Sequence, residues 1–588
     1  MDIFRSFSFR ATRALHVVAL ALFLSASLVL TGCDDDDDDG GMGTMPDQTI
    51  TELAANNSDL STLVSALQQA GLADDLEGQG PFTVFAPTNA AFNGIDADEL
   101  TSDDALLEEV LQYHVVAGQE IASGDIEDGD TVQTLQGETL TFSVDGGTVR
   151  VNGATVQTPD VQASNGVVHT IDGVLLETVN TTQRAVLTSQ LSTLATAVVE
   201  AELDDDLAGD GPFTVFAPLN TAFDDVDVDE LTGDDDLLNK VLTHHVVSGQ
   251  AIASGDISDG QTVETLQGSE LTFAVNNGTV TVNGVPVSTT DVRTSNGVVH
   301  LIDGVLLDVA TVTERAVLTP QLSTLTSAVQ SAGLADALNG SGPFTVFAPV
   351  NAAFEDIDAD ELTADNDLLN EVLTYHVVSG QSIAASNITD GQTVETLEGA
   401  DLTFAVDNGT VTVNGVPVST ADVQTSNGIV HLIDGVLLQS VDAVDRAILE
   451  PNFSILADLV GQAGLADALR GPGPDGEDGI TVFAPTNDAF LAALDTNGNG
   501  EIDDGEVPSN AGEILQYHVL DDVFFAADVP TSETPLPTLQ GSDVTVVRSG
   551  SDVTINPNAE AASVIAPDVT VENGVIHGID TVLSIPSE

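Results

Sequence analysis

The residues best suited to chemistry lie in a twelve-residue stretch near the end of the chain, residues 495–506. Oxygen-bearing side chains recur through it, and Gly500 stands at position six, where calcium loops turn sharply. The predicted ligands are Asp495, Asn497, Asn499, Glu501 through its backbone carbonyl, Asp503 through a water, and Glu506 as a bidentate carboxylate. Because calcium prefers about seven oxygen ligands, the stretch predicts a site for one Ca²⁺ ion.

The residues around this stretch indicate a lone calcium loop. Pro508 follows closely and would interrupt a long second helix, so a paired EF-hand sensor is not expected. We expect the ion to have a structural role in saline, calcium-replete surroundings. The alternative is a solvated acidic turn in a chain that is acidic throughout.

Histidines recur at two places in each of four repeats and could in principle bind a metal or act as general bases. The first set follows an apolar helical stretch and comprises Tyr113-His114, His244-His245, Tyr375-His376 and Tyr517-His518. The second set lies in apolar, strand-like segments and comprises His169, His300, His431 and His577. No zinc-site spacing, nucleophile elbow or His-Glu-x-x-His motif accompanies either set. We therefore expect structural histidines, and the chain is predicted not to be an enzyme.

The only cysteine, Cys33, follows an apolar stretch over residues 14–30 that is preceded by three arginines. The stretch ends in Leu30-Thr31-Gly32-Cys33, which resembles the bacterial lipobox. This resemblance implies that residues 1–32 are a lipoprotein signal peptide and that Cys33 is the site of lipid attachment. The alternative is an uncleaved transmembrane anchor, for which the apolar stretch is near the lower length limit.

Residues 33–46 are predicted to form an acidic flexible tether. Six consecutive aspartates repel one another and extend the chain, and the glycines after them keep it flexible. The sequence thus predicts an exported protein, lipid-anchored to the cell envelope on the periplasmic side or at the cell surface. With one thiol, the chain cannot form an internal disulfide, so each repeat depends on its own core.

Four repeats of domain length follow the tether. The motif Thr-Val-Phe-Ala-Pro begins at Thr83, Thr214, Thr345 and Thr481, at intervals of 131, 131 and 136 residues. Each repeat opens with helical periodicity, as over residues 60–67, followed by a buried-type strand over 82–86 and helical material over 89–113. Short strands over 131–132, 140–144, 148–152 and 167–176 complete it. Helices followed by strands around one core indicate an α+β fold.

Three segments in each repeat resemble the signature blocks of the fasciclin (FAS1) domain family. In the first repeat these are residues 83–92, the pair Tyr113-His114 and residues 165–175. Two departures are His244 in place of tyrosine and Thr581 in place of glycine. The resemblance implies four α+β domains, each with N-terminal helices packed on a β-rich wedge or sandwich, over residues 47–180, 181–311, 312–442 and 443–588. It also marks the Tyr-His pairs as a candidate interaction motif.

The charge of the chain is −83, with 11 Lys and Arg against 94 Asp and Glu. Such a surface repels nucleic acid, because no basic stripe is present to displace counterions from the phosphates. Self-repulsion also destabilises the compact state unless salt screens it. We therefore expect a halophilic, saline setting; the alternative is an acidic surface that serves solubility alone.

The leading functional hypothesis is adhesion or multivalent interaction at the cell envelope. Four copies of one module on a tether suit weak contacts that add together, and the fasciclin resemblance implies adhesion. The expected partners are the membrane, through the lipid anchor, and an unknown protein or glycan. The alternative is a module that binds an envelope polysaccharide or small ligand; the lack of Trp and the presence of only three Tyr disfavour it. Short linkers between repeats indicate a semi-rigid rod.

Overall fold

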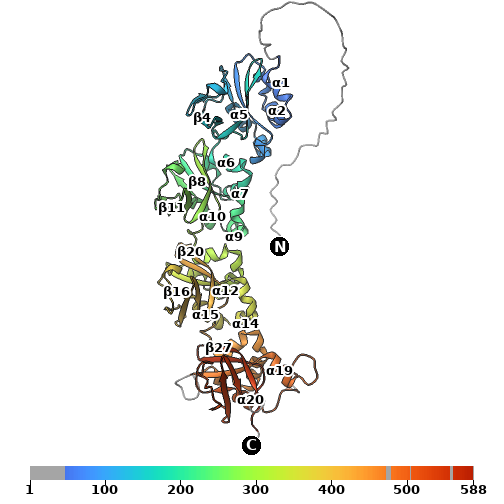
Figure 1. Ribbon diagram of the computed structural model, residues 1–588, viewed down its shortest axis with the longest axis vertical. Coiled ribbons are helices and arrows are strands. Elements are labelled where there is room, and N and C mark those ends of the chain that lie inside the picture. Colours follow the sequence, from blue (N-terminus) through green and yellow to red (C-terminus); the bar gives the residue numbers. More distant parts are fainter. Residues whose placement is uncertain (1–46, 472–478, 504, 557–560, 587–588) are drawn as a thin grey trace, which may run out of the picture.

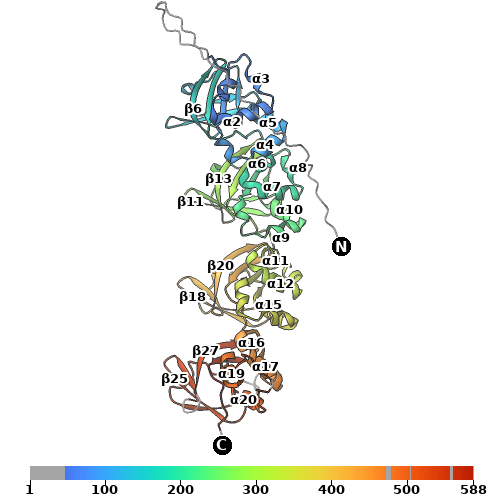
Figure 2. The ribbon, with the colours of Figure 1, turned by 90° about the vertical axis from the view of Figure 1, so that its right-hand side faces the viewer.

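Four similar units are stacked end to end in a computed structural model that describes residues 47–471, 479–503, 505–556 and 561–586 (Figure 1). Units 1 to 4 denote residues 47–180, 181–311, 312–442 and 443–588. Each consists of N-terminal helices and a seven-stranded sheet that curls into a near-barrel, so the predicted α+β class is confirmed. The strands of successive units lie toward the same side of the rod in both views (Figures 1 and 2).

The helices repeat in the same order in the first three units. Unit 1 has α1 (Ile50–Ala55), α2 (Ser61–Gln69), α3 (Ala73–Leu76), α4 (Ala97–Ser102) and α5 (Asp104–Tyr113). Unit 2 has α6 (Thr181–Leu187), α7 (Ser192–Glu200), α8 (Asp204–Ala208), α9 (Val228–Gly233) and α10 (Asp235–His244). Unit 3 has α11 (Val312–Val317), α12 (Ser323–Ser331), α13 (Ala335–Leu338), α14 (Ala359–Ala364) and α15 (Asn366–Tyr375). Unit 4 has α16 (Ala443–Leu449), α17 (Ser454–Ala463), α18 (Ala466–Leu469), α19 (Asn487–Leu494) and α20 (Ala511–Tyr517).

The strands repeat in the same way. Unit 1 has β1 (Phe82–Pro87), β2 (Val115–Ala117), β3 (Thr131–Gln133), β4 (Thr139–Asp145), β5 (Thr148–Val151), β6 (Ala154–Ala163) and β7 (Gly166–Ile171). Unit 2 has β8 (Phe213–Pro218), β9 (Val246–Ser248), β10 (Thr262–Glu264), β11 (Glu270–Asn276), β12 (Thr279–Val282), β13 (Val285–Thr294) and β14 (Gly297–Ile302). Unit 3 has β15 (Phe344–Pro349), β16 (Val377–Ser379), β17 (Thr393–Glu395), β18 (Asp401–Asp407), β19 (Thr410–Val413), β20 (Val416–Thr425) and β21 (Gly428–Ile433). Unit 4 has β22 (Ile480–Pro485), β23 (Val519–Leu520), β24 (Thr534–Pro537), β25 (Asp543–Ser549), β26 (Asp552–Ile555), β27 (Ala562–Val571) and β28 (Gly574–Ile579).

The sheet of unit 1 has the strand order β2-β1-β7-β6-β5-β4-β3, and the other units share it. The first and last long strands, β1 and β7, pair in parallel, whereas all other neighbours are antiparallel. Gly166 opens β7 opposite Phe82, where an added Cβ would stand 2.0 Å from the Phe82 carbonyl oxygen. Only glycine therefore permits the two strands to approach this closely.

Each unit contains two hydrophobic cores, one on either side of its central strands. In unit 1 the helix-side core contains Leu63, Leu107 and Val110. The core enclosed by the curled sheet contains Phe85 and Phe142. The alternation of side chains along a strand explains the pair of cores, because neighbouring residues of β1 point to opposite faces.

The local predictions differ from the structure in four places. The last strand, predicted over 167–176, ends at Ile171, and the short strand β2 was not predicted. The region 89–113, predicted to be helical, breaks into a short 3-10 turn, α4 and α5, because the Asp103 carboxylate caps a new helix by accepting from the N–H groups of Ala105 and Leu106. The long strand β6 was not predicted at all. Its sequence contains Gln, Pro and Asp and is mostly exposed, so it lacks the apolar alternation typical of strands.

Each later unit begins with a helix, and a leucine at the C-terminal end of this helix is buried in the core of the unit before it. Leu187, at the end of α6, belongs to the helix-side core of unit 1 and is 1% exposed. Its carbonyl oxygen accepts a hydrogen bond from the Asp96 N–H, directly before α4, at 2.9 Å. At the second junction the Leu318 carbonyl accepts a hydrogen bond from the Asp227 N–H, and at the third the Leu449 carbonyl accepts one from the Asp358 N–H. Both leucines are buried in the helix-side core of the preceding unit. Residues on both sides of each predicted boundary therefore share one core.

Candidate functional site

The predicted calcium loop extends from the end of α19 and is wrapped around its first carboxylate. Asp495 Oδ1 accepts a hydrogen bond from the Gly498 N–H at 2.6 Å, and Oδ2 accepts one from the Gly500 N–H at 2.9 Å. Both glycines have positive φ, 75° and 83°, which L side chains rarely adopt. The glycines thus allow the loop to turn sharply around Asp495.

The last predicted ligand folds back onto the start of the same loop. Glu506 Oε1 accepts from the Thr496 hydroxyl at 2.7 Å and the Thr496 N–H at 2.8 Å, and Oε2 accepts from the Asp503 N–H at 3.2 Å. These hydrogen bonds, first of all that of the Thr496 hydroxyl, hold the pKa of Glu506 below its usual value. Asn497 and Asn499 both donate to Asp503 Oδ2, at 2.8 and 3.1 Å.

The chemistry of this donor set suits calcium, because the side chains brought together offer oxygen ligands and no sulfur or imidazole. Within the described part of the chain, however, no group of three or more His, Cys, Asp or Glu side chains has a metal-holding arrangement. The calcium site therefore stays a prediction. The loop stands where units 1–3 have α4, α9 and α14, and α20 begins only at Ala511, three residues beyond Pro508.

The first set of histidines lies in the core, with both ring nitrogens in hydrogen bonds. His114 Nε2 accepts from the Leu175 N–H at 2.9 Å, so Nδ1 carries the proton and donates to the Val110 carbonyl at 2.8 Å. Burial lowers the pKa of His114 to about 4. The same two bonds and the same pKa of about 4 recur at His245, His376 and His518. These neutral imidazoles tie a helix end to the segment after the last strand.

The residue before each of these histidines is buried as well. Tyr113 is 2% exposed, and its hydroxyl donates to the Thr139 carbonyl at 3.0 Å and accepts from Asn152 Nδ2 at 2.7 Å. Tyr375 and Tyr517 make equivalent contacts. His244 instead contacts Asp308 at 3.1 Å and Ser269 at 2.6 Å. The candidate interaction motif is therefore not on the surface of the described structure.

The second set of histidines anchors loops to the sheet. His169 Nδ1 accepts from the Asp160 N–H at 3.2 Å, so Nε2 carries the proton and donates to the Ile121 carbonyl at 2.8 Å. The ring stacks on Phe85 with 5.3 Å between centroids. The copies His300, His431 and His577 do the same. The expectation of structural histidines agrees with these contacts.

The predicted lipid-attachment site, Cys33, and the tether to residue 46 lie outside the described residues. Across the segments that the structure does describe, none of the helices combines the length and apolar character needed to cross a membrane.

The pKa of the buried histidines predicts how stability depends on pH. A histidine with an ordinary pKa of about 6.5 binds a proton in the unfolded chain below that pH, whereas the folded one resists until about pH 4. His376 should therefore lower the unfolding free energy of unit 3 as pH decreases from about 6.5 to 4, by up to about 1.4 kcal/mol per pH unit. Glu371 of the same unit contributes with the opposite sign, because its pKa is raised to about 7, so the His376 contribution is the difference between the wild type and a variant without this histidine. Hydrogen exchange of unit 3 amides at several pH values measures this.

The matched variants are His376→Gln and Tyr375→Phe. His376→Gln should lower stability at neutral pH and remove the His376 contribution to the slope, while Tyr375→Phe keeps the histidine and the slope of the wild type. Equal slopes in all three proteins would show that His376 does not titrate as described.

The chain is similar to proteins built from fasciclin domains. The fasciclin domain model matches residues 58–177, 189–308, 320–439 and 451–586, well over half of the chain. Transforming growth factor-beta-induced protein ig-h3 of Sus scrofa is 31% identical over 538 residues, which cover 88% of this chain and 74% of that protein. Human periostin is 29% identical over 526 residues, 87% of this chain and 61% of its own length. Immunogenic protein MPB70 of Mycobacterium bovis is 36% identical over 184 residues, 29% of this chain and 93% of its own.

Proposed function

This chain belongs to the fasciclin family, a family of non-enzymatic adhesion proteins, and we propose that it mediates adhesion or multivalent interaction at the cell envelope. The observation that carries the proposal is the repetition of one module in one orientation. The four sheets lie toward the same side of the rod, so any contact made by one unit can be repeated by the next. Contacts that are weak singly then add through effective concentration.

The contact surface in this proposal lies outside the buried Tyr-His pairs. An exposed leucine recurs at one place in units 1–3, in the turn after β3, β10 and β17: Leu135, Leu266 and Leu397, which are 43%, 44% and 44% exposed. A single exposed leucine is ordinary on a protein surface. Three at the same place on three stacked units offer a partner protein a repeated apolar contact.

The lipid anchor in the proposal rests on the sequence around Cys33. A lipid on this residue would hold the rod at the envelope through residues 33–46, so that the remote units reach outward. The excess of acidic residues, with a net charge of −83, suits saline surroundings in which salt screens the repulsion between units.

Calcium is proposed as a stabiliser of unit 4. The ion would be held by Asp495, Asn497, Asn499, Glu501, Asp503 and Glu506, which come from both ends of the loop. By joining these ends, it would fix a loop that is otherwise exposed. The oxygen-only donor set and the two left-handed glycines support this proposal.

The adhesion proposal predicts a graded loss of cell binding. Cells producing the wild-type protein should adhere to one another or to isolated envelopes, and Leu135→Ser should weaken this only slightly. The triple variant Leu135→Ser/Leu266→Ser/Leu397→Ser should weaken it by about tenfold or more, because avidity multiplies the contributions of the units.

Two controls accompany this cell-binding assay. Cys33→Ala should release the protein from the membrane fraction and abolish adhesion of the cells. The proposal fails if Cys33→Ala cells adhere like the wild type, or if adhesion does not exceed that of cells lacking the protein.

The calcium proposal predicts saturable binding of about one ion per chain by calorimetric titration of the whole protein. Asp495→Ala/Glu506→Ala should remove this binding, because it removes both ends of the ligand set. Asp224→Ala/Asp225→Ala removes the same charge from an exposed acidic run and should leave it unchanged. Absence of a saturable site, or equal loss in both variants, would reduce the loop to an acidic turn.

A further inference from the structure

A polar cavity of about 810 Å³ lies at the junction between units 1 and 2. Unit 1 contributes the side chains of Glu109, Glu138 and Glu177 to its lining, and unit 2 contributes Arg184, Arg293 and Asp291. The unit 1 side of the lining is thus acidic, and the unit 2 side carries both arginines together with one acid. In a chain with 94 acidic and 11 basic residues, two arginines facing one cavity are a notable concentration of positive charge.

The arginines of this cavity form no close ion pair with its acids. Neither Arg184 nor Arg293 forms an ion pair with any residue that the structure describes. Arg184 Nε and Glu177 Oε2 are both buried without a hydrogen-bond partner. Burial raises the pKa of Glu109 and of Glu177, and at Glu177 the nearby Arg184 and Arg293 oppose this shift. A buried donor and a buried acceptor left unpaired are costly, so groups from outside would be favoured here.

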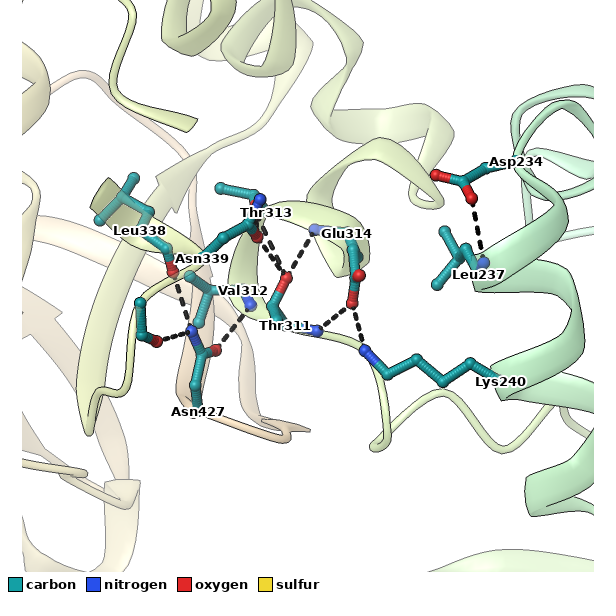
Figure 3. A network of polar contacts seen from close by, with 11 residues as sticks. Asp234, Leu237, Lys240, Thr311, Val312, Thr313, Glu314, Leu338, Asn339 and Asn427 are labelled. Carbon is teal, nitrogen blue, oxygen red and sulfur yellow. Dashed lines mark hydrogen bonds and ion pairs between the residues drawn. The ribbon is translucent and has the colours of Figure 1, made fainter. Parts of the chain in front are cut away.

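The junction between units 2 and 3 repeats this arrangement of elements, but an ion pair within the protein bridges the two units. Lys240 replaces Glu109 and Glu314 replaces Gln183, each at the 131-residue repeat. The Lys240 Nζ contacts Glu314 Oε2 at 2.7 Å and bridges the two units (Figure 3). Beside this bridge, His244 contacts Asp308 at 3.1 Å. Lys240 and His244 therefore contact acids within the protein, whereas Arg315 forms no ion pair and its Nε is buried without a hydrogen-bond partner.

The junction between units 3 and 4 also uses its cations internally. Arg446 pairs with Glu450 at 2.5 Å, and Arg470 pairs with Asp442 at 3.1 Å and with Asp445. Among the described residues, Arg184 of the first junction and its counterpart Arg315 of the second both lack an ion pair, and the Nε of each is buried without a hydrogen-bond partner. The first junction is distinguished by Arg293 and by the absence of a bridge like that between Lys240 and Glu314. This difference is encoded by a few side chains, since the backbone repeats.

We propose that the cavity between units 1 and 2 binds a small zwitterion, of the size of an amino acid or a dipeptide. The carboxylate of the ligand would contact Arg184 and Arg293, and its ammonium group would contact Glu109 and Glu177. The ligand would supply the bridge between units that Lys240 and Glu314 supply at the next junction. This site is independent of the adhesion proposal.

Other ligand classes fit the walls less well. A simple anion would meet the acidic wall, and a simple cation would meet the arginines. A sugar would lack an exposed aromatic face to stack on, because the lining aromatic side chains Tyr113 and Phe142 are 2% and 3% exposed. A metal ion is disfavoured by the two arginines, since cations repel one another.

The test is calorimetric titration of the whole protein with the dipeptide glycylglutamine and with L-glutamine. At least one should bind at one site per chain. N-acetylglycylglutamine, which lacks the ammonium group, and glycylglutamine amide, which lacks the carboxylate, should bind about tenfold more weakly or not at all, because each has lost its charge-assisted hydrogen bonds.

Two variants distinguish this cavity from other sites. Arg293→Gln introduces the residue that units 1 and 3 carry at the same position, Gln162 and Gln424, and should weaken binding about tenfold while the fold is kept. Glu109→Lys/Gln183→Glu places the lysine and the glutamate of the second junction at the first junction and should abolish binding. Arg548→Gln removes a cation from unit 4 and should have no effect. The proposal is overturned if neither zwitterion binds, if the blocked peptides bind equally, or if the junction variants bind like the wild type.

Discussion

Burial of one leucine across each junction is the interaction on which the whole stack depends. Leu187 and Leu449 end the first helices of units 2 and 4, Leu318 directly follows that of unit 3, and each is buried in the core of the unit before it. The first unit has Asn56 at the corresponding position, as the C-cap of α1. Complete burial of a leucine contributes about 2 kcal/mol, which is a large fraction of the marginal stability of one domain. Folding of neighbouring units is thereby coupled, as in repeat proteins.

This coupling acts against the electrostatic repulsion between four acidic units. Three of the 11 basic residues precede residue 46, and eight follow it. Six of these eight lie at the junctions, two at each: Arg184 and Arg293, Lys240 and Arg315, Arg446 and Arg470. Positive charge is thus placed where negative surfaces meet. Glu371 stands in unit 3 at the position that Lys240 has in unit 2. Its pKa is raised to about 7, first by burial and then by nearby carboxylates.

The sequence was sufficient for the fold class, the number of units and the succession of helices and then strands within each, because apolar periodicity and the repeated motifs indicate these features. It could also assign the histidines, since His114 and His169 stand among apolar neighbours. It could not show that Leu187 leaves its own unit, because the apolar face of a helix does not say which core receives it. Nor could it show the cavity at the first junction. The lining of this cavity includes Glu109 and Arg293, which lie 184 residues apart in the sequence.

The most direct test of the central claim is hydrogen exchange of the whole protein with Leu318→Asn, a change that copies Asn56 of the first unit. Leu318 follows α11 of unit 3, yet its side chain lies in the core of unit 2. Amides of α9 and α10 in unit 2 should therefore lose protection, by about 2 kcal/mol or more in opening free energy. If protection falls only in unit 3, or does not change, the units fold separately and the junction leucine does not couple them.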